Sequence, residues 1–175
     1  VNNPTRDYIV AGSGNISGGA SLTKIGARKL TLATTNSYTG GTAINGGTLE
    51  ISEDGNLGTA GSAVSISGGI LDGGTGVYAL PGRPFQLGTG NATFTNSAGG
   101  SVTTDGAITG TGSLTKIGAG TLTLSGANFN NSLTVNAGTL AVSNSTCNGN
   151  LLSSGTGAKM TIDNSVCGTS AVSLL

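Results

Sequence analysis

The acidic side chains of this sequence have the clearest capacity for chemistry, because two carboxylates one turn apart in a repeating fold can share acid and base catalysis on polysaccharides. The chain holds seven, which are Asp7, Glu50, Glu53, Asp54, Asp72, Asp105 and Asp163. Glu50 and Asp72 have the spacing of one such turn, but two glycines follow Asp72 and predict a turn there. We therefore favour solvated turn residues over a catalytic pair, and we predict no catalytic residue and no enzymatic activity.

Two further groups of residues have the composition of a binding site without its spacing. Residues 53–56 (EDGN) offer oxygen atoms of the kind that bind Ca²⁺, but they match neither an EF-hand nor a calcium-binding nonapeptide repeat. Lys24 and Lys116 are equivalent in two similar segments, and each precedes a glycine without an acidic residue at a fixed offset. We expect a solvated corner at 53–56 and exposed corner positions for both lysines. The sequence therefore predicts no metal site and no cofactor.

The two cysteines follow similar tetrapeptides, Asn-Ser-Thr-Cys147 and Asn-Ser-Val-Cys167. Their spacing is about one turn of the proposed repeat, so they should lie on neighbouring turns. Stacked Cα atoms would be ~4.8 Å apart, within the range of about 4.4–6.8 Å that a disulfide needs. We favour a disulfide between Cys147 and Cys167 over two buried free thiols.

The composition indicates what kind of fold positions the acidic residues, lysines and cysteines. Gly, Thr, Ser and Asn make up more than half of the 175 residues, while aromatic residues account for 3% and charged residues for 8%. One thick core is not expected with so few large side chains, yet a hydrophobic content of 35% is too high for a disordered chain. The aliphatic residues must be buried in many thin layers. Seven basic and seven acidic residues cancel, so we expect no nucleic-acid partner.

An internal repeat supplies those layers. Residues 22–52 (LTKIGARKLTLATTNSYTGGTAINGGTLEIS) and 114–143 (LTKIGAGTLTLSGANFNNSLTVNAGTLAVS) share LTKIGA, LTL and GTL in the same order. Short runs such as LTL at 30–32 and LAV at 140–142 alternate apolar and polar residues, which is typical of strands with one buried face. Comparable runs return after roughly 20 residues. The pattern predicts an all-β parallel β-helix, a solenoid with roughly 20 residues per turn.

One excursion from the solenoid is predicted in the middle of the chain. Pro81 and Pro84 cannot donate hydrogen bonds to a strand ladder. We therefore place residues 80–85 in a loop that leaves the helix, where solenoids often carry binding surfaces.

The repeat resembles the passenger-associated transport repeat of bacterial autotransporters, whose pattern is approximately LTKxGxGTLTLSGxNTYTGGTTVNGGTL. The first copy departs from it at residues 28–29 and the second at residues 128–132, which are corners. The resemblance implies a right-handed β-helix that is exported across the outer membrane by a C-terminal β-barrel, which is absent from this fragment. It also implies a place on the bacterial cell surface or in the medium. We expect residues 1–175 to be a single β-helix fragment of a longer passenger.

This resemblance favours a non-enzymatic scaffold that acts as an adhesin or a self-association module. Its partner would be a host cell surface, an extracellular matrix component or a second copy. The alternative is a stalk that supports a protease, esterase, toxin or receptor-binding activity located elsewhere in the full-length protein. An ice-binding solenoid would need Thr-x-Thr pairs in register on most turns, and the pairs at 93–95 and 121–123 are scattered.

Overall fold

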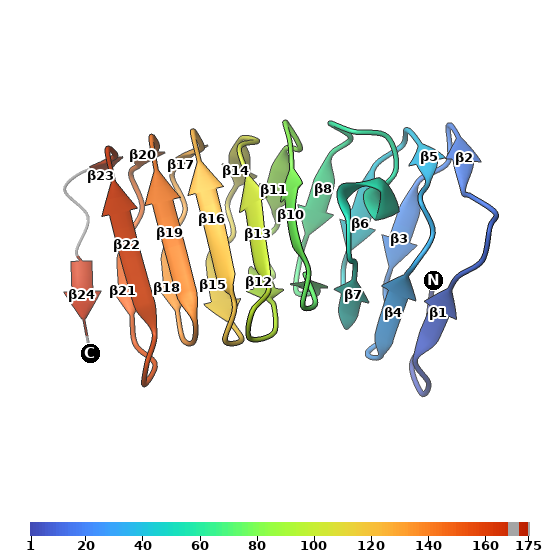
Figure 1. Cartoon of the computed structure of the whole chain (residues 1–175), viewed down its shortest axis with the longest axis horizontal. Helices are drawn as coiled ribbons and strands as arrows, with labels where there is room; N and C mark the ends of the chain where they lie inside the picture. The colour runs from blue at the N-terminus through green and yellow to red at the C-terminus, as the bar shows by residue number, and fades with distance from the viewer. Residues whose placement is uncertain (168–171, 175) are drawn as a thin grey trace.

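The computed structural model describes residues 1–167 and 172–174 as a stack of short strands (Figure 1). The remaining positions of the predicted fragment, 168–171 and 175, lie outside the described residues. Every strand pairing is parallel, and each strand pairs with one about a turn away in the sequence. The predicted all-β parallel solenoid with about 20 residues per turn is therefore confirmed. Its right-handed sense stays a prediction.

The first face of the solenoid is one continuous sheet, which we call the long sheet. It supplies one strand per turn, so that consecutive strands in it stack on each other. Its nine strands, in order, are β1 (Tyr8–Val10), β4 (Lys29–Leu32), β7 (Thr48–Glu50), β9 (Ile70–Asp72), β12 (Ala92–Thr95), β15 (Leu114–Ile117), β18 (Leu133–Val135), β21 (Leu151–Ser153) and β24 (Val172–Leu174).

The second face combines a strand pair, a short helix and a five-stranded sheet. The strand pair stacks on the helix, and the helix contacts β10 of the sheet. These elements are β2 (Ser17–Gly18), β5 (Ser37–Tyr38), the 3₁₀ helix η1 (Asp54–Leu57), β10 (Val77–Leu80), β13 (Ser101–Thr104), β16 (Thr121–Ser125), β19 (Thr139–Ser143) and β22 (Lys159–Asp163).

The third face consists of a five-stranded and a three-stranded sheet, which meet where β14 contacts β17. Its strands are β3 (Leu22–Lys24), β6 (Thr42–Ile44), β8 (Val64–Ile66), β11 (Phe85–Leu87), β14 (Ile108–Gly110), β17 (Asn128–Phe129), β20 (Thr146–Cys147) and β23 (Val166–Cys167). The part of the chain that the structure describes contains no helix with the length and hydropathy of a membrane-spanning segment.

The core is a set of inward-facing columns that run along the solenoid. On the long sheet, Leu30, Leu49 and Leu71 are paired in register and are fully buried. On each strand, the residues next to the buried leucine face outward, as the period-two alternation predicts. Each turn buries its aliphatic side chains among themselves and against its two neighbours, which is how a chain with few large residues builds a core.

Tight corners let the turns stack this closely. Gly47 and Gly138, equivalent in the two repeat copies, have φ angles of 61° and 68°. A Cβ atom on Gly47 would overlap the carbonyl oxygen of Gly26 one turn below, and one on Gly138 would overlap that of Gly118. Only glycine combines this backbone conformation with so close an approach.

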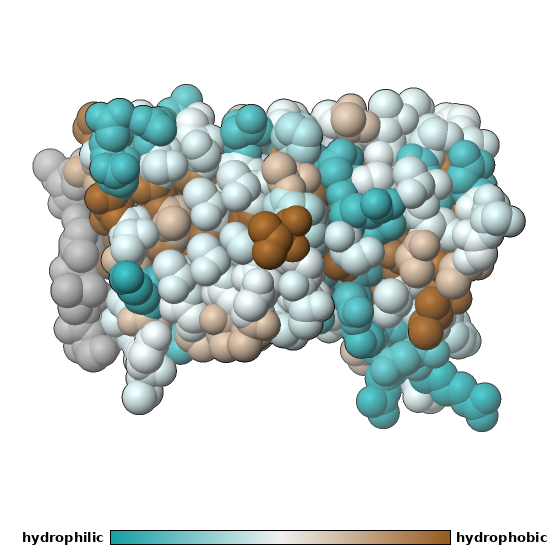
Figure 2. All heavy atoms as spheres, viewed as in Figure 1, coloured by the Kyte–Doolittle hydropathy of each residue, from teal (hydrophilic) through white to brown (hydrophobic). Residues whose placement is uncertain are grey.

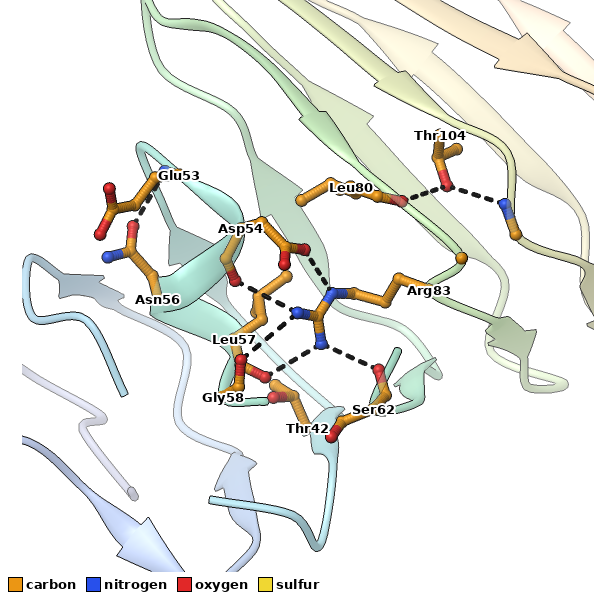
Figure 3. A network of polar contacts seen from close by, with 12 residues as sticks. Thr42, Glu53, Asp54, Asn56, Leu57, Gly58, Ser62, Leu80, Arg83 and Thr104 are labelled. Carbon is orange, nitrogen blue, oxygen red and sulfur yellow. Dashed lines mark hydrogen bonds and ion pairs between the residues drawn. The ribbon is translucent and has the colours of Figure 1, made fainter. Parts of the chain in front are cut away.

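The predicted loop over residues 80–85 corresponds to the connection between β10 and β11. Leu80 ends the first strand and Phe85 begins the second, and both side chains are buried. Residues 81–84 alone lie between the strands. Within them, the Arg83 side chain is fully buried and turns back toward η1 (Figure 3).

The two repeat copies pass through the same succession of elements but start on different faces. The first copy begins with β3 on the third face and continues with β4 on the long sheet. The second begins with β15 on the long sheet and continues with β16 on the second face. The second copy is therefore rotated by one face about the solenoid axis relative to the first.

Candidate functional site

Glu50 and Asp72 lie one above the other on the long sheet, where β7 pairs with β9. The stacking that their spacing suggested is confirmed. Both carboxylates already have partners, because Glu50 forms an ion pair with Lys29 and Asp72 Oδ1 accepts a hydrogen bond from the Gly74 N–H at 2.9 Å. These are the contacts of a surface ion pair and of a tight turn.

Residues 53–56 form a polar turn in which Glu53 is exposed, as expected of a solvated corner, and Asn56 turns inward. Asn56 is buried, and its Oδ1 accepts hydrogen bonds from the N–H groups of Ser52 at 2.8 Å and Glu53 at 3.1 Å. The Glu53 carboxylate accepts a hydrogen bond from the Thr35 hydroxyl at 2.5 Å. These oxygen atoms therefore accept hydrogen bonds from donors within the protein. Among the described residues, no group of three or more His, Cys, Asp or Glu side chains could hold a metal ion.

Arg83 binds this turn through an ion pair and hydrogen bonds. It is a structural residue that was not predicted from the sequence. Its Nε lies 2.8 Å from Asp54 Oδ1, and its guanidinium donates to the carbonyl oxygens of Leu57 at 3.1 Å and Ser62 at 2.9 Å (Figure 3). Its planar fork of donors suits this cluster of acceptors. An arginine between two prolines, in a chain with only seven basic residues, was the available signal.

Lys24 corrects the prediction of exposed corner lysines. The side chain faces inward from β3, is fully buried, and is paired with Ile44 in an otherwise aliphatic column. Its Nζ donates to the carbonyl oxygens of Gly26 and, at 3.1 Å, of Gly46 on the next turn. Burial lowers the pKa of Lys24, and the Asp7 carboxylate partly opposes this shift.

Lys116 shows the same arrangement in the second copy, and the prediction of exposure is wrong there too. It is fully buried on the long sheet between Phe94 and Val135, with which it is paired. Its Nζ donates to the carbonyl oxygens of Ile117 at 2.5 Å and Gly118 at 2.8 Å. Desolvation lowers the pKa of Lys116 to about 8. The period-two alternation of Leu-Thr-Lys assigns both lysines to the inner face, whereas the following glycine and the lack of an acidic residue at a fixed offset favoured an exposed corner.

Buried asparagines complete the corners next to both lysines. Asn3 donates through Nδ2 to the carbonyl oxygen of Lys29 at 2.8 Å, and Asn96 donates in the same way to that of Thr121 at 2.8 Å. Both Oδ1 atoms are buried without a hydrogen-bond partner. The two asparagines lie one turn before equivalent positions of the two repeats, so each corner uses the same set of polar groups.

The cysteines lie in register on β20 and β23, with Cα atoms 4.5 Å apart, and form a disulfide. This is the geometry that their spacing predicted. The bond joins two consecutive turns on the third face. Its formation is typical of proteins that fold outside the reducing cytosol.

The outer side of the second face presents an array of hydroxyl groups. Ser101, Thr121 and Thr139 are paired in register in one column, and Thr103 and Thr123 in the next. Strands β13, β16 and β19 contain no charged residue. Figure 2 shows this part of the surface mainly in the pale colours of intermediate hydropathy. Parallel strands hold such groups at a regular spacing of about 4.8 Å, which suits repeated weak hydrogen bonds with a partner.

The Thr-x-Thr pairs remain scattered in the structure. Thr93 and Thr95 lie on β12 of the long sheet, whereas Thr121 and Thr123 lie on β16 of the second face. They do not form one plane.

Comparison with known proteins identifies one matching family and one similar protein. The family described as passenger-associated-transport-repeat matches residues 22–51 and 114–142. The adhesin BmaC autotransporter of Brucella suis biovar 1 (strain 1330) is 42% identical to the chain over 103 residues, which are 59% of this chain and 3% of that protein. The chain thus spans only a small part of the length of this relative. No solved structure matches the chain.

The repeat match covers the segments that carry LTKIGA, the buried lysines and the glycine corners. The match to the adhesin extends beyond them, and both agree with the parallel solenoid of the structure. The chain therefore carries two passenger-associated-transport repeats and is similar over part of its length to an autotransporter adhesin.

Proposed function

We propose that this segment is a non-enzymatic, adhesive part of a passenger displayed on the bacterial cell surface or released from it. The observation that carries the proposal is the uncharged hydroxyl array of β13, β16 and β19. Its partner is a host cell surface, a matrix component or a second copy of the chain. Many weak, equally spaced contacts reach useful avidity when long passengers present them side by side.

Three findings support this proposal. The similar protein from Brucella suis is named an adhesin. In addition, the acidic residues discussed above are engaged in ion pairs, turns or corner hydrogen bonds. The disulfide suits an oxidising environment outside the cytosol.

The competing proposal is a stalk that supports an activity located elsewhere in the passenger. It is favoured by one observation, which is that the chain corresponds to 3% of its relative. A stalk needs the same stacked turns and the same polar exterior, so surface chemistry must distinguish the two proposals.

The test compares matched substitutions on two faces. Thr103→Glu with Thr123→Glu places two stacked charges on the hydroxyl array, and Thr115→Glu with Thr134→Glu places them on the long sheet. All four threonines are half-buried and outward-facing. We expect wild-type chain and the long-sheet variant to bind host cells or matrix, or to self-associate in sedimentation, and the array variant to lose at least tenfold in affinity.

Equal binding by both variants would overturn the assignment of the array. Absence of any binding or self-association by the folded wild-type chain would instead favour the stalk.

A further inference from the structure

The rotation between the repeat copies limits what the repeat can do. Equivalent outward residues lie on different faces, because Thr23 belongs to the third face and Thr115 to the long sheet. The copies therefore cannot build one ligand surface from their shared sequence. The two copies share the inner geometry of a corner. The function common to both copies therefore depends on buried residues of the solenoid.

The shared corner centres on a buried lysine ammonium. Lys24 binds the carbonyl oxygen of Gly26, and Lys116 binds that of Gly118, the equivalent residue. A methionine or leucine would fill the same inward position without the cost of desolvating an ammonium group. The lysine therefore supplies something that an aliphatic side chain cannot, namely donors for corner carbonyl groups that face the interior.

The next turn closes directly on these carbonyl groups. Gly47 packs so tightly against Gly26 O that it has no room for a Cβ atom, and Gly138 packs in the same way against Gly118 O. In the first copy, Lys24 also reaches Gly46 O on that next turn, at 3.1 Å. The lysine thus orients the surface on which the following turn must settle.

The preceding turn is tied to the same corner by a buried asparagine. The Asn3 backbone lies against Gly26, and the Asn96 backbone lies against Gly118, again without room for a Cβ atom. Three consecutive turns therefore meet at each corner, with the lysine in the middle one.

We propose that Lys24 and Lys116 are positioning residues for folding, which fix the corner carbonyl groups before the next turn docks and so set the rate at which turns add to the solenoid. The proposal deepens the role of the repeat in a surface-displayed passenger and rests on that proposed function only for its biological setting. A chain that emerges through a membrane in an extended state gains stability turn by turn, because each turn interacts mainly with its neighbours. A corner organised early gives each arriving turn a prepared template.

Folding kinetics of the full 175-residue chain test this role. An interaction formed before the transition state changes the folding rate, whereas one formed later changes mainly the unfolding rate. We expect Lys116→Met to slow refolding from urea about tenfold, and to change the unfolding rate less than twofold. The matched control is Lys159→Met, which alters an exposed lysine on β22 and should leave both rates unchanged.

A second variant keeps the test decisive if the methionine chain does not fold. Lys116→Gln retains N–H donors without the charge, and it should refold within about threefold of the wild-type rate. An unchanged refolding rate in Lys116→Met, or a Lys116→Gln chain that folds as slowly as the methionine variant, would overturn the proposal.

The folding experiment and the adhesion experiment test different properties, so one can fail while the other succeeds. Folded Lys116→Met chain should bind partners as wild type does, because the lysine is buried. The Thr103→Glu, Thr123→Glu chain should show the reverse pattern, with lost binding and an unchanged refolding rate.

Discussion

Lys116 and Phe94 are paired in register on adjacent strands of the long sheet, and both side chains face the core. The lysine side chain thus shares an inward column with an aromatic residue and, on its other side, with Val135. Its donors bind backbone carbonyl oxygens, and desolvation is the cause of its lowered pKa. This arrangement links the stability of the solenoid to pH in a way that a purely aliphatic column would not.

The first prediction is that stability rises with pH between about 8 and 10.5. The pKa of Lys116 is about 8 in the folded chain, against an ordinary value of 10.5. The unfolded chain therefore binds more protons in this window, so raising the pH favours the folded state by up to ~3 kcal/mol. Urea unfolding at pH 7, 8.5 and 9.5 measures the effect. These values stay below the range where Tyr78, whose pKa is raised by burial, would oppose it.

The control for this prediction is Lys116→Met, which should flatten most of the pH dependence. The lowered pKa of Lys24 contributes a remaining slope of the same sign. A wild-type stability that is constant from pH 7 to 9.5, or a slope that survives the substitution unchanged, would contradict the prediction.

The second prediction concerns the inward columns. Leu49→Ala removes a fully buried side chain that lies in register with Leu30 and Leu71. The lost burial and the cavity should lower the free energy of unfolding by about 2–5 kcal/mol. Thr48→Ala, at the outward-facing neighbour, should change it by no more than about 0.5 kcal/mol. Equal effects of the two substitutions in urea unfolding would be inconsistent with the observed alternation.

These columns show what the sequence allowed us to predict. Alternating runs and their return after about 20 residues were sufficient for the strands and their stacking, since burial of one strand face follows from side-chain geometry alone. The Cys147–Cys167 pair followed from the same period. The inward position of the lysines was predictable from the alternation, but the following glycines and the lack of acidic partners led us to expect exposed corners. The rotation of the second repeat was not predictable, because the unequal turns between the copies leave the number of faces undetermined.

The buried contacts of Arg83 could not be predicted from the sequence, for a different reason. Its partners lie more than twenty residues upstream: Asp54 and Leu57 in the helical turn that replaces a strand on the second face, and Ser62 in the connection that follows it. No periodic signal marks such an exchange of one element for another. The arginine and its acceptors come together only in the folded chain.

The third prediction follows from that network. Arg83→Leu would leave the buried carbonyl oxygen of Leu57 and the partly buried one of Ser62 without their donor, and Asp54 without its ion pair. We expect a loss of about 2–4 kcal/mol, given a cost of roughly 1–3 kcal/mol for each buried acceptor left unsatisfied. Arg28→Leu, at an exposed arginine, is the control and should have little effect. If both variants unfold at the same urea concentration, the network does not stabilise η1.

The last prediction concerns the disulfide between Cys147 and Cys167. The bond closes a loop of about 20 residues, for which chain entropy alone gives a stabilisation of ~3 kcal/mol. Because each turn interacts mainly with its neighbours, the loss on reduction should be local. Hydrogen exchange after reduction should therefore accelerate by about a hundredfold in β20, β22 and β23, while amides of β4, β7 and β9 keep their protection. The Cys147→Ser, Cys167→Ser chain serves as a control without thiols and should behave like the reduced protein. Uniform acceleration along the whole solenoid would instead mean that the turns unfold as one cooperative unit, and the nearest-neighbour account of its stability would have to be abandoned.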